Sequence, residues 1–226
     1  MTIYSNLDRF GVSGAYLEGL KWIEMLEANH SLSQKEEWQV NEMKALLLNE
    51  RGNQDEFLPI WYKLLKQYRE ADRPEDVGKC LLTIANHFIM LEDYENALPL
   101  YKEAYQLALE HKSIELQQVS GIMLIKYLCG AGYYSESLEY YNKIKPEIAF
   151  NPSMQNEVVK SYMELNKPDS ARIYLAARLL SERGDKIVLN CMMAETYIPE
   201  GQEDSAFVFL DRAMKSYKEK AKNYQK

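Results

Sequence analysis

The fold of this chain is decided by one stretch, Leu91-Glu92-Asp93-Tyr94-Glu95-Asn96-Ala97-Leu98-Pro99-Leu100-Tyr101-Lys102-Glu103-Ala104. Its first four residues are typical of a turn between helices. Behind that turn, Ala97 and Tyr101 are four residues apart, and twelve residues before Ala97 the pair Ala85 and Phe88 is three apart. Steps of three and four place side chains on one face of a helix. The stretch therefore predicts that two helical faces fold against each other around a short turn.

The same spacing occurs five times along the chain. The five sets are Ala45, Leu48, Phe57, Trp61; Ala85, Phe88, Ala97, Tyr101; Ile125, Leu128, Ser137, Tyr141; Val159, Tyr162, Ala171, Leu175; and Ala194, Tyr197, Ala206, Leu210. A turn signal stands inside each set, at 51–53, 91–94, 130–132, 166–169 and 200–202. Connections between sets are expected at 70–76, 110–113 and 145–152. The third members of the sets are 40, 40, 34 and 35 residues apart, so about six extra residues lengthen helices or connections in the first repeats.

We therefore predict an all-α chain of about eleven helices without strands, arranged as a stack of helix hairpins. Residues 1–226 form a single helical repeat domain in this interpretation. Residues 1–37 supply an N-terminal half-repeat that acts as a cap, residues 38–217 supply five repeats, and residues 218–226 form a basic C-terminal tail. Each hairpin is too thin to bury its own apolar face, so consecutive hairpins must pack on one another.

The segment 91–104 resembles the second half of a tetratricopeptide repeat (TPR), in which a small residue, an aromatic residue and another small residue follow one another as Ala97, Tyr101 and Ala104 do. The resemblance extends over about residues 38–217. The family's early Trp, its Gly at the first small position and its closing Pro are missing from these copies. The resemblance implies a right-handed superhelix, or solenoid, of antiparallel hairpins, whose first helices line a concave groove.

Composition and charge narrow the function classes. The net charge of −7 and the isoelectric point near 5.2 argue against a nucleic-acid partner, although residues 215–226 contain five lysines. No apolar run is long enough for membrane insertion, and the N-terminus lacks the features of a secretory signal. We expect a cytoplasmic location, or a periplasmic one if a leader was removed. The thiols of Cys80, Cys129 and Cys191 are spaced unlike a disulfide framework or a metal site and are expected to be buried.

No catalytic constellation is recognisable in the sequence. His30, His87 and His111 fall in different repeats, and His87 is expected to flank a packing seam rather than to act as a base. No nucleophile elbow, metal-binding His pair or Walker-type loop is present. We therefore predict no catalytic residue, no metal site and no cofactor, and expect the protein not to be an enzyme.

The resemblance assigns the inner face of the first helices to partner binding. That face would present Gln39, Glu42, Asn49; Lys79, Leu82, Asn86, Ile89; Val119, Ile122, Lys126; Asn156, Lys160, Met163; and Val188, Cys191, Glu195. Its middle would hold the candidate site residues Lys79, Asn86, Lys126, Asn156 and Lys160. Cationic and amide side chains suit a carboxylate or an acidic extended peptide. The alternative interpretation is a row of solvated polar side chains.

Two functions follow as hypotheses. The first is a non-enzymatic interaction scaffold that binds a peptide or protein partner in the concave groove. The alternative is a sensory or linker TPR region of a bacterial signalling or transcription-regulatory protein, cut from a longer chain. This alternative is based on the sequence segments 167–171 and 203–206 and on the basic segment 218–222. No pattern in the sequence predicts an oligomeric state.

Overall fold

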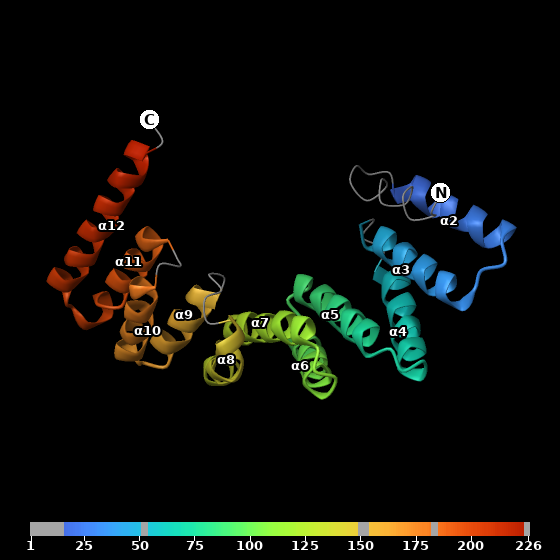
Figure 1. Cartoon of the computed structure of the whole chain (residues 1–226), viewed down its shortest axis with the longest axis horizontal. Coiled ribbons are helices and arrows are strands. Elements are labelled where there is room, and N and C mark those ends of the chain that lie inside the picture. The colour runs from blue at the N-terminus through green and yellow to red at the C-terminus, as the bar shows by residue number, and fades with distance from the viewer. Residues whose placement is uncertain (1–15, 51–53, 149–153, 182–184, 224–226) are drawn as a thin grey trace. The chain divides into compact units, whose positions relative to one another are not determined.

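The computed structural model describes residues 16–50, 54–148, 154–181 and 185–223. These residues form eleven α-helices and one short 3₁₀-helix, and no strand occurs among them. Backbone contacts divide the chain into two compact units, residues 1–116 and 117–226. The all-α prediction is confirmed for the part of the chain that the structure describes (Figure 1).

The first unit contains five complete helices and the start of a sixth. They are α2 (Tyr16–Asn29), α3 (Gln34–Glu50), α4 (Gln54–Glu70), α5 (Pro74–Met90), α6 (Tyr94–Glu110) and the first turn of α7 (Ile114–Gly130). The unit boundary lies between residues 116 and 117, inside α7. The second unit continues with α8 (Tyr134–Ile148), α9 (Gln155–Glu164), α10 (Pro168–Leu180), α11 (Lys186–Glu195), the 3₁₀-helix η2 (Ile198–Glu200) and α12 (Glu203–Asn223).

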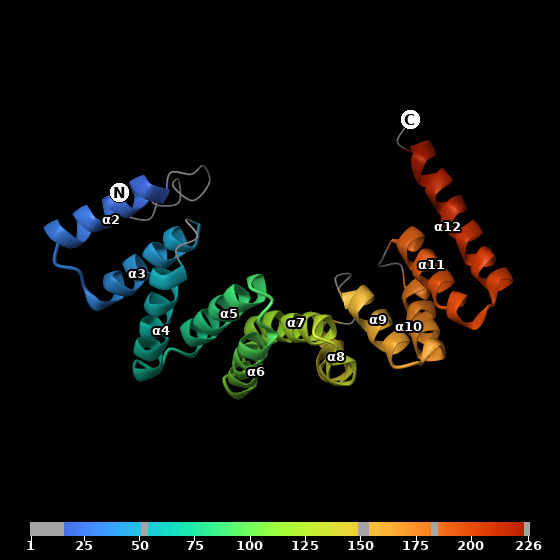
Figure 2. The ribbon, with the colours of Figure 1, turned by 180° about the vertical axis from the view of Figure 1, so that it is seen from behind.

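Within each unit, helices that follow one another in sequence pack side by side, as α3 does on α4, α5 on α6, and α11 on α12 (Figure 2). The predicted helix ahead of the first repeat is α2. Its Leu20, Ile23 and Leu26 pack with Val40 and Leu47 of α3. The helix α2 therefore packs its apolar stripe on the next helix, and its role as a half-repeat stays a prediction.

Six of the turns between described helices share one hydrogen-bond pattern. In each, a backbone N–H donates to the carbonyl five residues earlier, at N···O distances of 2.8–3.2 Å. The donors are Arg73, Asp93, Ser113, Tyr133, Lys167 and Gln202. The residue before each donor has a positive φ of 52–85°. This is the Schellman motif, which satisfies the last carbonyls of the helix that it ends.

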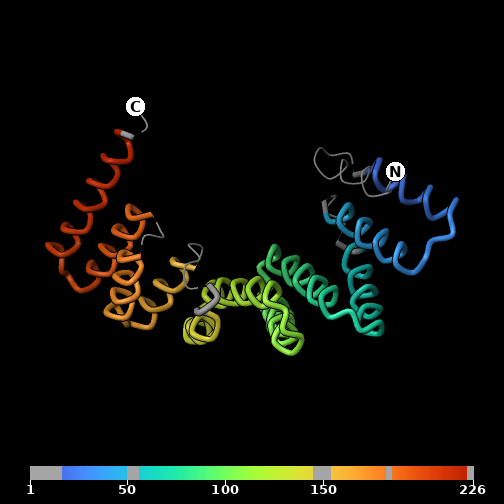
Figure 3. The backbone as a smooth tube through the Cα atoms, in the orientation of Figure 1, coloured from blue at the N-terminus to red at the C-terminus, as the bar shows by residue number. Residues whose placement is uncertain are grey.

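The regular turns explain the long repeats. Positive-φ residues occur at positions 72, 92, 112 and 132, so each of α5, α6 and α7 occupies 20 residues with its turn, and a hairpin in this part of the chain occupies 40. The helices α4, α5, α6 and α7 each have 17 residues, whereas α9 and α11 have 10 and α10 has 13. The extra residues of the first repeats therefore lengthen the helices rather than the connections (Figure 3).

Most predicted turns are where the sequence placed them, but two connections differ. The expected connection at 70–76 is shorter, because Pro74 takes the first position of α5, where its missing N–H costs nothing. The helix α8 continues to Ile148, past the expected connection beginning at residue 145, so that part of the prediction is wrong. The expected turn at 51–53 and the end of the third connection, residues 149–152, lie outside the described residues.

The predicted packing seam is largely confirmed. Sixteen of its twenty residues are buried, and Phe88, Tyr162 and Tyr197 are half-buried. In the third hairpin the Ser137 hydroxyl donates to the carbonyl of Ile125 at 2.8 Å, which joins the two predicted partner positions directly. The exception is Leu210, which is 44% exposed, while Phe209 stacks on Tyr197 with ring centroids 5.6 Å apart.

Two of the three thiols are buried, as the sequence predicted, and His87 is also buried. Cys80 and Cys129 are buried, and Cys191 is half-buried. Burial raises the pKa of the Cys80 thiol to about 12. His87 is buried against Phe57, with ring centroids 5.0 Å apart, and this burial lowers the pKa of its imidazole. His87 is therefore part of the packing, as expected.

The left-handed turn residues allow a test of the turn motif. Gly132 has a φ of 85°, and a Cβ added there would meet no atom within 4 Å. A substitution at this position therefore causes no steric clash with other residues, and its only cost is the backbone strain of a non-glycine residue at positive φ. Gly132→Ala is expected to lower the free energy of unfolding by about 1 kcal/mol. Urea unfolding measures the loss. Gly132→Asn is the control, because Asn tolerates this conformation, and equal losses for Ala and Asn would contradict the explanation.

Candidate partner-binding groove

A hollow of about 600 Å³ lies between the first helices of the last two hairpins, α9 and α11, within the second unit. Its lining is Asn156, Val159, Lys160, Met163, Ile187, Val188, Cys191, Met192, Glu195 and Thr196. The helix α10 packs on both α9 and α11 and so sets their spacing. The small Ala171 of α10 is fully buried in the cluster that includes Val159, Leu189 and Met193, which lets the helices approach closely.

The beginning of α11 is fixed by Asp185. Its carboxylate accepts a hydrogen bond from the backbone N–H of Ile187 at 2.9 Å and thereby caps the helix. Lys220 of α12 forms an ion pair with the same carboxylate at 3.2 Å. The backbone hydrogen bond and this lysine hold the pKa of Asp185 below its ordinary value. Asp185 thus joins the start of α11 to α12.

The end of α11 is fixed by Arg172 of α10. The Arg172 guanidinium donates to the carbonyl of Thr196 at 2.7 Å and to its hydroxyl at 3.3 Å. It also pairs with Asp169 at 3.0 Å and with Glu200. Its Cζ lies 4.0 Å from the ring centroid of Tyr197. The side chain is 14% exposed, so these contacts form in a largely dry environment where charge-assisted hydrogen bonds are strong.

The chemistry of the hollow is an apolar floor with a polar rim. Val159 and Met192 are buried, and Met163 and Ile187 are half-buried. Val188 is 46% exposed, so an apolar ligand would cover it. Asn156, Lys160 and Glu195 are exposed and supply amide, ammonium and carboxylate groups. This arrangement can take an apolar side chain and orient the polar backbone around it.

The structure distributes the five predicted site residues over the two units. Lys79 and Asn86 lie on α5 in the first unit, while Lys126 lies on α7 and Asn156 and Lys160 lie on α9 in the second. All five are exposed. Asn156 and Lys160 line the hollow between α9 and α11, and Lys126 is not among its lining residues. A partner role for the five residues stays a prediction.

Three of these residues have contacts of their own. The amide oxygen of Asn86 accepts a hydrogen bond from the Tyr101 hydroxyl, across the hairpin of α5 and α6. Lys79 lies 4.0 Å from the carboxylate of Asp76 on the same helix. The ammonium group of Lys126 lies 5.2 Å from the ring centroid of Tyr127. Asn86 therefore also stabilises the hairpin of α5 and α6. The sequence pattern had assigned Asn86 only to the partner-binding face.

All six residues that the resemblance assigns to the inner face of the last two repeats line the hollow: Asn156, Lys160, Met163, Val188, Cys191 and Glu195. The floor residue Ile187 and the supporting contacts of Arg172 were not predicted from the sequence. Helical spacing gives a signal for the floor, because Met192 is four residues after Val188. It gives none for Arg172, whose partners Thr196 and Glu200 are 24 and 28 residues away.

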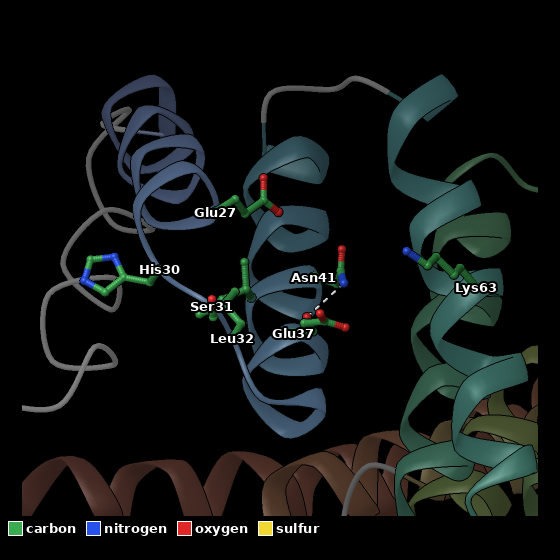
Figure 4. Close-up of a pocket in the computed structure, with 8 residues that line it drawn as sticks. Glu27, His30, Ser31, Leu32, Glu37, Asn41 and Lys63 are labelled. Carbon is green, nitrogen blue, oxygen red and sulfur yellow. Dashed lines mark hydrogen bonds between the residues drawn. The ribbon is translucent and has the colours of Figure 1, made fainter.

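A second hollow, of about 500 Å³, lies in the first unit among α2, α3 and α4 (Figure 4). Glu27, His30, Ser31, Glu37, Asn41 and Lys63 give it a mainly polar lining, with Leu32 and Val40. The Asn41 amide donates to the Glu37 carbonyl at 2.8 Å, and Glu27 pairs with Lys44 at 3.2 Å. Since it offers less apolar surface to a ligand, the hollow between α9 and α11 is the stronger candidate.

Neither a metal-binding group nor a membrane-spanning helix occurs in the described part of the chain. No three His, Cys, Asp or Glu side chains within it come together as a group able to hold a metal ion. None of its helices combines the length and the apolar character needed to cross a lipid bilayer.

No model of a known protein family matches the sequence. A search of curated proteins also finds no match. Solved structures do match. BtubC (BKLC) from P. vanneervenii has a TM-score of 0.64 at 14% identity, covering 95% of this chain and 92% of that one. MamA has a TM-score of 0.59 at 15% identity, covering 79% of this chain and 96% of that one.

A tetratricopeptide repeat protein from Parabacteroides merdae has a TM-score of 0.51 at 18% identity, covering 94% of this chain and 78% of that one. Together with the helix hairpins and their small-residue seams, these matches place the fold in the class of helical repeat proteins. The chain has a tetratricopeptide-type fold, as the stretch at 91–104 predicted.

Proposed function

We propose that this protein is a non-enzymatic interaction scaffold that binds an extended segment of a partner protein along the exposed faces of its first helices. The observation that supports this most is the hollow between α9 and α11, because it combines an apolar floor with exposed polar groups. A few anchors in a preformed concave surface supply most of the affinity in such complexes, and no chemistry is required.

The lining favours a particular kind of ligand. Val188 and the half-buried Met163 and Ile187 suit one apolar anchor side chain. Thioether side chains such as that of Met163 adapt to anchors of different shape. Lys160 and Asn156 suit a carboxylate next to that anchor, and Glu195 on the opposite helix disfavours a second one nearby. We therefore propose a peptide with one apolar residue flanked by an acidic residue on one side.

The test uses an array of peptides that differ only in the anchor and in the charge of its neighbours, probed with the full chain. We expect the Lys126→Glu, Lys160→Glu double variant to bind acidic-flanked peptides at least about tenfold more weakly, because it reverses both cationic groups of the second unit's predicted groove. Fluorescence anisotropy gives the dissociation constants, and circular dichroism checks that the variant is folded.

The matched control reverses the same number of charges on second helices, in Lys66→Glu with Lys143→Glu. Both lysines are exposed and form i,i+4 ion pairs, which contribute little to stability. The control is expected to bind like the unchanged protein. Equal binding by the groove variant and the control variant would remove the groove proposal. A Val188→Asp variant tests the anchor separately, since it places a charge on the floor.

A further inference from the structure

The last helix, α12, exposes a continuous apolar stripe. Its members, spaced by three and four residues, are Phe207, Leu210, Met214 and Tyr217. They are between 44% and 66% exposed. Ala206 and Ala213, on the adjoining side of the helix, are buried, and Phe209 packs against Tyr197, which precedes α12. The stripe thus borders the face that α12 turns toward its own hairpin, but its side chains stay exposed.

Two earlier second helices, α4 and α6, bury most of the equivalent positions. Counted from the small residues Ala97 and Ala206, the stripe corresponds to Leu98, Tyr101, Tyr105 and Ala108 of α6, which are at most 6% exposed. In α4 the corresponding residues are Leu58, Trp61, Leu65 and Tyr68. These pack in the core cluster that also contains Val77 and Leu81 of α5, the next first helix. The stripe of α12 is therefore the surface that another helix covers elsewhere in this protein.

The charges beside the stripe indicate which helix covers it. Asp204, Asp211 and Lys218 are seven residues apart, so they follow one line along the same side of the stripe. Lys222 continues beyond Lys218, while Glu203 is at the acidic start. One end of α12 is therefore acidic and the other basic. A second α12 in antiparallel orientation would place the acidic end of each helix beside the basic end of the other.

A parallel copy would instead place like charges side by side, which is unfavourable. Two other lysines of the helix have partners within the chain, since Lys215 pairs with Asp211 at 2.6 Å and Lys220 pairs with Asp185 at 3.2 Å. The Asp211–Lys215 pair is exposed and contributes little, so Asp211 can exchange partners at small cost.

We propose that the protein self-associates as a two-fold symmetric dimer in which the exposed stripe of α12 packs antiparallel against that of a second copy. The contact is isologous, because each helix contributes the same apolar residues and the same charge pattern. It leaves the hollow between α9 and α11 outside the contact, since none of its lining residues belongs to α12. One dimer then presents two copies of the proposed groove, which raises avidity for a partner that carries two binding segments.

Sedimentation velocity of the full chain over a concentration series tests the dimer. We expect the weight-average mass to rise from the monomer value of 26.4 kDa toward twice that mass. The variant Phe207→Glu, Met214→Glu should remain monomeric, with a dimer dissociation constant at least about a hundredfold weaker. The control Ile173→Glu changes another highly exposed apolar side chain of the second unit and should dimerise normally.

Charge exchange tests the orientation. The variant Asp204→Lys, Asp211→Lys makes α12 basic along its length, and Lys218→Glu, Lys222→Glu makes it acidic. Each is expected to self-associate more weakly than the unchanged protein, while an equimolar mixture of the two forms a heterodimer. A mixture that associates no better than its components would overturn the antiparallel arrangement.

Other results would overturn the proposal as a whole. They are a monomer throughout the series, a dimer that survives the two stripe substitutions, and loss of the dimer in the Ile173→Glu control. Circular dichroism and thermal unfolding accompany every variant. If the stripe substitutions unfolded the protein, the stripe would belong to the fold itself, and the proposed dimer surface would be wrong.

Discussion

Replacing Ala97 by Trp is expected to lower the free energy of unfolding of the first unit by about 3 kcal/mol, the largest effect of overpacking that we predict. Ala97 is fully buried where α6 crosses α5, and Tyr101 one turn later is fully buried as well. An indole at position 97 has no space at this contact, so the two helices must separate. The hydrogen bond between Tyr101 and Asn86 across the same hairpin would then be lost.

Thermal unfolding of the full chain measures this change, and hydrogen exchange shows whether protection is lost in α5 and α6 first. The control is Ala28→Trp, which adds the same side chain at an exposed position of α2 in the same unit. We expect the control to unfold close to the unchanged protein. A normal transition for Ala97→Trp would mean that the assigned register of the hairpin is incorrect.

Replacing Arg172 by Met is expected to destabilise the second unit by about 2–3 kcal/mol, because it removes a charged donor from partners that stay in place. Met retains most of the apolar stem and so isolates the effect of the guanidinium. The carbonyl of Thr196 would lose its partner, and Glu200 would lose its ion pair. The turn between α11 and α12 would then lose its charged contacts to α10 and keep its backbone hydrogen bonds and the stacking of Phe209 on Tyr197.

Urea unfolding, with hydrogen exchange in α11 and η2, measures this loss. The matched control is Asp169→Ala, which removes another partner of Arg172. The carboxylate of Asp169 is 86% exposed, and such exposed ion pairs contribute less than about 1 kcal/mol. Similar losses for the two variants would show that the buried contacts to Thr196 are not the important ones. Because Arg172 holds the end of α11, its loss should also weaken peptide binding at the hollow.

The repeated spacing predicted the hairpins well because it reports local geometry. Ala45, Ala85 and Ala194 pack where the sequence placed them, and most of their partners are buried. Helical periodicity and small residues act over three to twelve positions, so they are visible in the sequence itself. The end of α8 differs from the predicted connection at 145–152 because a proline such as Pro146 favours the end of a helix without enforcing it.

The candidate site was only partly predictable. The inner-face positions of the last two repeats followed from the resemblance, and all six line one hollow. The size of that hollow depends on how far α10 holds α9 and α11 apart, which no local pattern expresses. The exposure of Leu210 was missed for a related reason, because the seam pattern describes a helix with neighbours on two sides and α12 has a described helix on one side only.

By itself, the sequence determined which residues form helices, where the turns fall and which faces meet within a hairpin, because backbone hydrogen bonds and helical spacing act locally. The tertiary structure alone decided the hollow between α9 and α11, the role of Arg172 and the uncovered stripe on α12. Each of these depends on side chains that are distant in the chain, or on which of the described helices pack together. The space and exposure around a side chain are properties of the assembled packing, which a one-dimensional pattern does not contain.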